Sequence, residues 1–148
     1  MVQVVINYWA VIVCAIVNMA LGFYWYGPLF GRQWVALMGW SKEEVEKGQI
    51  KMQKEGWKTY LLAFAGSLIM ACVLAHVLVF SSTYLGISGL IAGLDVGFFA
   101  WLGLSATTMS LDYIFTSKSK PWTLFIISSG CQLVTLVVIS AILFLFNK

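Results

Sequence analysis

Four long apolar stretches constrain this chain more than any other feature. They cover residues 2–26, 60–80, 87–109 and 122–146. A helix needs about 20 apolar residues to cross the hydrocarbon core of a bilayer, because each residue adds about 1.5 Å of rise. Each stretch is continuous rather than alternating, and a helix satisfies its own backbone hydrogen bonds where water is absent. The sequence therefore predicts an all-α integral membrane protein, a single domain over residues 1–148 with four transmembrane helices in an up-down bundle.

The composition excludes several other classes of protein. Apolar residues make up 61% of the chain and charged residues only 10%, whereas soluble domains typically have about 45 to 50% and about 25%. A secreted disulfide scaffold, a disordered tail and a nucleic-acid binder are excluded, and the expected surroundings are the lipid bilayer. The first stretch is not a signal peptide, because no basic residue precedes Arg32.

The basic residues predict the orientation in the membrane. Two linkers carry eight of the nine, and Lys148 is the ninth. Because short basic loops stay in the cytoplasm, we expect both charged linkers to be cytoplasmic and both termini to lie outside the inner or plasma membrane. The eight are Arg32, Lys42, Lys47, Lys51, Lys54, Lys58, Lys118 and Lys120.

The linker at residues 27–59 predicts two short helices. Trp25 and Tyr26 stand at the expected interface depth, after which Gly27 and Pro28 are expected to turn the chain. The following segment, with Trp34, has the pattern of a short interfacial helix in which Phe30, Trp34 and Leu37 face lipid. Gly39 is expected to end it.

A polar cytoplasmic helix should follow, leading into the second span. Ser41 and Glu44 have the spacing of a capping box, and Glu43 and Lys47 can pair one turn apart. A solvated helix is the simpler interpretation, and a face that docks a partner is the alternative.

Two motifs at the start of the chain resemble a known family. They are Asn7-Tyr8-Trp9-Ala10 and Trp25-Tyr26-Gly27-Pro28-Leu29-Phe30-Gly31, which Trp34 follows. They are similar to a family of small bacterial four-span membrane proteins described as a domain of unknown function. The similarity is strongest over the first 40 residues. It implies the four-span architecture and no particular reaction.

Asp95 is the first candidate for a functional residue, because a carboxylate inside a span costs about 2.5 to 3.5 kcal/mol on insertion scales. His76, the single histidine, lies near the end of the second span. A short linker joins the second and third spans, so we expect an adjacent antiparallel hairpin with the two side chains at similar depth. A His-Asp centre can hold a proton, bind an ion or orient a ligand, or it can be a buried structural pair.

Metal binding is a weaker possibility. Cys72 lies one turn before His76, so Cys72, His76 and Asp95 have the residue types of a three-ligand site. Cysteines inside spans are more often small apolar fillers, however. We expect no cofactor and no metal.

Polar residues form stripes on the first and fourth spans. Asn7, Cys14 and Asn18 share one helical face. The fourth span carries Ser128, Cys131, Gln132 and Thr135. Such stripes are expected to face the bundle interior as packing contacts, and the alternative is a polar path that binds a solute or ion through Asn7, Asn18 and Gln132.

Gly89, Gly93 and Gly97 are spaced four residues apart on the third span, a pattern typical of close helix contacts. At 100° per residue this stripe lies about 200° from Asp95. If Asp95 faces the bundle, the glycines face another copy of the protein. If the glycines pack within the protomer, Asp95 faces a subunit interface or a pore. Either geometry favours an oligomer, most simply a homodimer, unless the third helix is central.

These observations favour an oligomeric protein that binds or transports a small solute or ion through His76 and Asp95. One alternative is an accessory or structural subunit that docks onto a larger membrane complex. A second is an enzyme acting on a lipid or quinone, although the sequence has no nucleophile motif.

Overall fold

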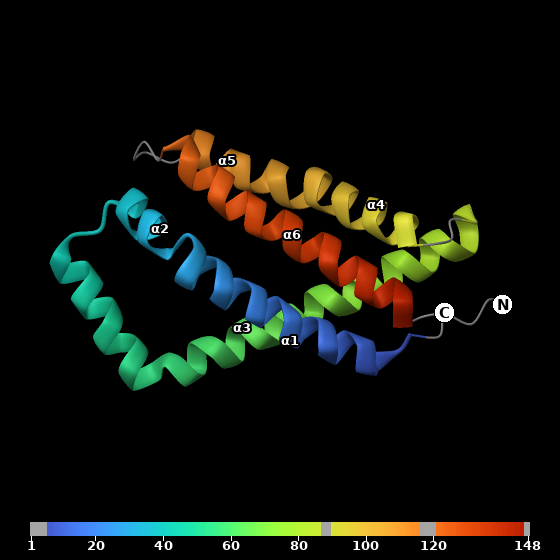
Figure 1. Ribbon diagram of the computed structural model, residues 1–148, viewed down its shortest axis with the longest axis horizontal. Coiled ribbons are helices and arrows are strands. Elements are labelled where there is room, and N and C mark those ends of the chain that lie inside the picture. Colours follow the sequence, from blue (N-terminus) through green and yellow to red (C-terminus); the bar gives the residue numbers. More distant parts are fainter. Residues whose placement is uncertain (1–5, 87–89, 116–120, 147–148) are drawn as a thin grey trace.

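The computed structural model describes residues 6–86, 90–115 and 121–146, and all of the regular structure in these residues is helical (Figure 1). In this part of the chain, four helical stretches are long and apolar enough to cross a membrane: Tyr8–Leu29, Lys42–Leu85, Leu90–Phe115 and Trp122–Phe146. The all-helical class is confirmed, and these stretches indicate a membrane protein.

The first stretch consists of α1 (Tyr8–Tyr24) and a π-helix, η1 (Trp25–Leu29), after which α2 (Gly31–Met38) follows. The expected turn at Gly27-Pro28 is wrong, because both residues lie inside η1. Pro28 has no N–H to donate, which interrupts the α-helical ladder, and the Phe30 N–H bonds the Trp25 carbonyl at 2.9 Å instead. The helical geometry breaks at Phe30, whose φ is −120°. Gly39 ends α2 as predicted, in the left-handed conformation.

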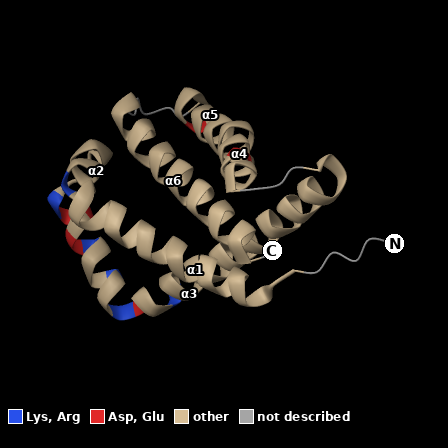
Figure 2. Ribbon diagram, turned by 45° about the vertical axis from the view of Figure 1, so that its right-hand side comes forward, with Lys and Arg blue, Asp and Glu red and all other residues tan. Residues whose placement is uncertain are grey.

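The polar helix and the second span form one helix, α3 (Lys42–Leu85), which has 44 residues. The predicted capping box is present: the Glu44 N–H donates to Ser41 Oγ at 3.2 Å, and the Ser41 N–H donates to Glu44 Oε2 at 2.7 Å. Figure 1 shows that α3 bends between its charged beginning and its apolar remainder. The charged residues of this part and of α2 gather at one end of the molecule (Figure 2). Lys118, Lys120 and Lys148 lie outside the described residues.

The third stretch runs beyond its expected end. It comprises α4 (Leu90–Ala100), a second π-helix, η2 (Trp101–Ala106), and α5 (Thr107–Phe115). Asp112 therefore lies in a helix, whereas the sequence placed it in a linker. The last helix, α6 (Trp122–Phe146), has the bounds that were predicted.

The helices pack in the order α3, α1, α6, α4, with α6 between α1 and α4 (Figure 1). Fully buried small and branched side chains fill the centre, among them Ala10, Cys14, Ala75, Ile139 and Leu143. The expected close hairpin of the second and third spans is wrong, because α3 and α4 make little contact with each other. α4 packs against α6 instead, which leaves a groove between α3 and α4.

Candidate functional site

The glycines of α4 face the interior of the protomer. A β-carbon placed on Gly97 would lie 2.7 Å from the Leu136 carbonyl oxygen and 2.8 Å from Val137 Cα, both on α6. One placed on Gly93 would lie 3.2 Å from the Ser140 carbonyl oxygen. At Gly97 only glycine permits this approach of the two backbones, whereas a side chain at Gly93 would require its neighbours on α6 to shift by a few tenths of an ångström. Gly89 lies outside the described residues.

Asp95 consequently faces outward. It lies two positions from both Gly93 and Gly97, and so on nearly the opposite side of α4. Its side chain is exposed, and no hydrogen bond or ion pair joins its carboxylate to any described residue. The structure thus has the arrangement in which the glycines pack within the protomer and Asp95 faces the surroundings.

His76 also faces outward, on α3. The buried residues of that turn, Ala71, Leu74 and Ala75, lie on another side of the helix. The His76 Nδ1–H donates to the Cys72 carbonyl oxygen at 2.8 Å, because a carbonyl can only accept, and Cys72 Sγ lies 3.9 Å from Nδ1. Among the described residues, His76 and the carboxylate of Asp95 form no hydrogen bond or ion pair with each other.

The metal-site possibility fails for the same reason. Within residues 6–86, 90–115 and 121–146, no group of three His, Cys, Asp or Glu side chains is close enough to hold a metal ion. Cys72 and His76 lie together on α3, but Asp95 lies across the groove on α4 and does not complete the set.

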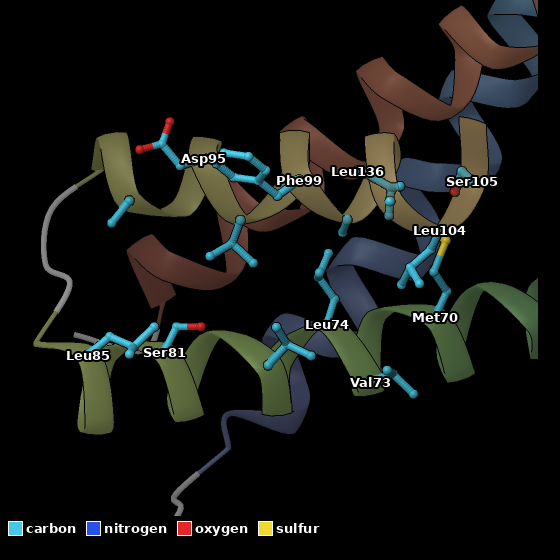
Figure 3. A pocket seen from close by; sticks show the side chains of 15 residues that line it. Met70, Val73, Leu74, Ser81, Leu85, Asp95, Phe99, Leu104, Ser105 and Leu136 are labelled. Atoms are coloured by element: carbon cyan, nitrogen blue, oxygen red, sulfur yellow. The ribbon is translucent and has the colours of Figure 1, made fainter. Parts of the chain in front are cut away.

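The groove between α3 and α4 is a cavity of about 750 Å³. Its walls are apolar side chains of α3, α4 and η2, with Leu136 of α6 behind them (Figure 3). Asp95 is the only charged residue of the described lining, and Ser81 and Ser105 are its hydroxyl groups. His76 does not line it. In Figure 3 the Asp95 carboxylate stands at the rim, directed away from α3.

The polar residues of α1 make structural contacts. The Asn7 side chain caps α1 by accepting from the Trp9 and Ala10 N–H groups, and its Nδ2 donates to the Phe146 carbonyl at 3.3 Å. Asn18 Nδ2 donates to Ser67 Oγ on α3 at 2.6 Å. These contacts fit the packing interpretation of the stripe rather than a polar path.

On the fourth span, Gln132 is half-buried, while Cys131 and Thr135 are buried. Cys14, from the α1 stripe, points its thiol toward the Ile139 carbonyl of this helix at 3.8 Å. The two polar stripes therefore meet the bundle interior, as the sequence predicted.

The predicted interface aromatics pack on one another and on α6. Trp25 Nε1 donates to the Ile127 carbonyl at 3.0 Å, so this side chain joins the first helical stretch to α6. The Tyr26 and Trp34 rings lie 5.4 Å apart, and Trp34 lies 5.3 Å from Trp40. A role as membrane anchors stays a prediction for all three predicted residues.

Two residues that line the groove with Asp95 were not predicted from the sequence. Phe99, four positions on, is exposed by 66% and leans its ring toward Asp95 (Figure 3). The spacing of four residues on a helix was the signal that could have found it. Gly103 also lines the groove, and a β-carbon added there would meet no atom within 4 Å. No sequence pattern indicated this.

Comparison with known proteins identifies a family. A family described as "Protein of unknown function (DUF1761)" matches residues 9–144. No curated protein and no solved structure matches the chain.

Proposed function

Because the chain belongs to the DUF1761 family, whose function is unknown, we propose its function from the placement of Asp95. The protein is an oligomer that binds or transports a small solute or an ion within the membrane, with Asp95 at the polar centre. The observation that carries this proposal is an exposed carboxylate without a hydrogen bond or ion pair in the described structure, on a helix apolar enough to span a membrane.

The cost of placing a charge inside the membrane supports an oligomer. An uncompensated carboxylate inside a span costs about 2.5 to 3.5 kcal/mol, and the protomer supplies no described partner to reduce that cost. Since Gly93 and Gly97 occupy the inward face of α4, a partner for the ionised carboxylate has to come from outside the protomer. A subunit interface or a central pore provides it, because water, a bound ion or another copy can then reach the carboxylate.

His76 fits the same proposal as a residue that acts between protomers. It is exposed on α3 and does not reach its own Asp95. In a homodimer whose two-fold axis is parallel to the membrane normal, residues at similar depth on the outward faces of two copies can meet. The His-Asp centre is then completed by the second copy.

The proposed orientation follows from the charges. The basic residues of α2 and of the beginning of α3 lie at one end of the molecule (Figure 2), and the positive-inside tendency assigns that end to the cytoplasm. Both termini are then outside the plasma or inner membrane, and Asp95 lies in the outer half of the bilayer.

The experiment compares Asp95→Asn with Asp112→Asn, which makes the same change in α5, outside the lining of the groove. The purified full chain is reconstituted in liposomes that contain a pH-sensitive dye, and the decay of imposed proton and potassium gradients is recorded. We expect wild type and Asp112→Asn to dissipate at least one gradient at least tenfold faster than Asp95→Asn. The mass of the protein in each wild-type nanodisc should be at least twice the 16.5 kDa of one chain.

Two results contradict the proposal. One is a monomer in nanodiscs together with equal gradient decay in both variants and in empty liposomes. The other is constant co-purification with a different membrane protein, which would favour the accessory-subunit alternative. The lipid or quinone enzyme stays a prediction without a supporting contact.

A further inference from the structure

The α3–α4 groove has the walls of a binding site for an apolar molecule. Its volume of about 750 Å³ lies within the range of about 300 to 1,000 Å³ that is typical of small-molecule sites. In Figure 3, Leu74 and Met70 of α3 point toward the facing helix, which carries Phe99 and Leu104. Because this groove opens beside helices that span the membrane, an apolar molecule can enter it from the lipid.

The one charge of the groove selects among apolar molecules. We infer that the groove binds an amphipathic organic cation, whose apolar body lies between α3 and α4 and whose charged group lies against Asp95. This inference rests on the proposed function, because it names the class of solute that the Asp95 centre takes. An anion is repelled by the carboxylate, and an uncharged molecule lacks the Coulomb attraction that a cation gains from it.

An inorganic cation fits the groove less well than an organic one. Hard cations such as Ca²⁺ take six to eight oxygen ligands. Apart from Asp95, the side-chain oxygens of the lining belong to Ser81 and Ser105, and Ser105 lies at the opposite end of the groove from Asp95 in Figure 3. A quaternary ammonium or phosphonium group needs no such shell, since its own substituents are apolar.

Phe99 supplies a second feature that recognises a cation. Its ring lies next to Asp95 on the same helix and is 66% exposed (Figure 3). The face of an aromatic ring attracts ammonium-type cations, most strongly where water is excluded. A carboxylate and an aromatic face side by side at the mouth of an apolar groove are complementary to a cation with an apolar body.

The test uses two probes of the same shape and opposite charge, tetraphenylphosphonium and tetraphenylborate. Their binding to the full chain in nanodiscs of phosphatidylcholine is measured by equilibrium dialysis against empty nanodiscs. We expect wild type and Asp112→Asn to bind the phosphonium equally, and Asp95→Asn to bind it at least tenfold more weakly. Tetraphenylborate should bind no better to wild type than to empty nanodiscs.

A second pair of variants tests the location. Gly103 lines the groove, and a β-carbon added there would meet no atom within 4 Å, so Gly103→Phe fills the groove without a clash at its first atom. Gly66 on α3 has the same open space and lies outside the groove lining, so Gly66→Phe is the control. We expect Gly103→Phe to lose phosphonium binding and Gly66→Phe to keep it. Phe99→Leu, which keeps the apolar surface, should weaken binding by about threefold.

The outcomes separate this inference from the proposed function. Phosphonium affinity that is equal in wild type, Asp95→Asn and Gly103→Phe overturns the cation site, even if Asp95→Asn abolishes ion flux. Equal binding of both probes likewise overturns it and indicates a lipid-tail groove. Phosphonium binding that depends on Asp95 and Gly103 supports the site, even if no ion gradient decays, in which case only ion transport is contradicted.

Discussion

The two faces of α4 differ in almost every physical respect, although their residues alternate along one short helix. Gly97 approaches the α6 backbone so closely that no side chain fits between the helices there, and Gly93 also lies tightly against α6. Asp95 and Phe99 are exposed on the other side, beside an open groove. The close face fixes where the helix lies, and this fixed position leaves the opposite face free to present a charge. The comparison teaches that Gly93 and Gly97 of this span pack within the protomer rather than facing a second copy.

The largest expected effect on stability comes from adding a side chain on the face of α4 that contacts α6. Gly97→Leu places a side chain where the Leu136 carbonyl and Val137 Cα lie within 2.8 Å of its first atom. Because backbone atoms cannot rotate away as a side chain can, α4 and α6 have to separate. We expect a loss of about 3 kcal/mol, at the upper end for overpacked cores. Thermal unfolding in detergent, followed by helical circular dichroism, measures it.

Gly103→Leu is the matched control for that variant, since a β-carbon there meets no atom within 4 Å. If Gly97→Leu and Gly103→Leu had equal melting temperatures, the close contact of α4 with α6 would not contribute to the stability of the protein.

A smaller effect is expected where the close contact continues into η2. Trp101 Nε1 donates to the Ser129 carbonyl at 2.9 Å and to Ser129 Oγ at 3.1 Å, and Ser129 is buried. Trp101→Phe keeps an aromatic ring and removes the donor. The net loss should be about 1 kcal/mol, measured as a lower midpoint in the same thermal unfolding. Unchanged stability would indicate that the ring packing alone holds η2 against α6.

The sequence predicted the elements better than their faces. The bounds of α6 were correct because an apolar run preceded by Pro121 leaves a helix few alternatives. The sequence did not predict that the polar helix and the second span form one continuous helix. Each part has its own helical pattern, and nothing in the residues shows whether a break separates them. Asp95 was singled out as a candidate because a single carboxylate in an apolar run is conspicuous.

Pairing of Asp95 with His76 could not be settled by their closeness along the chain. The rotation of α4 about its own axis is set by the fit of Gly93 and Gly97 against Ser140 and Leu136, which belong to a distant helix. The sequence allowed both possible rotations and had no means to choose between them. The same contact explains the groove, since a helix drawn toward α6 moves away from α3.

The smallest expected effect on stability belongs to the residue with the largest expected effect on function. Asp95→Asn removes no hydrogen bond or ion pair of the described protomer and leaves the shape of the side chain unchanged. In a detergent that separates the protomers, we therefore expect the unfolding free energy to change by no more than about 0.5 kcal/mol, as for exposed substitutions generally. The same thermal unfolding in detergent measures it, on the purified protein from which the nanodiscs for phosphonium binding are made. If Asp95→Asn is stable but no longer binds the cation, Asp95 serves binding on the exposed face of α4 and does not contribute to stability. A large loss of stability would instead mean that the carboxylate contributes to holding the protein together, and the two faces of α4 would then not be separate in function.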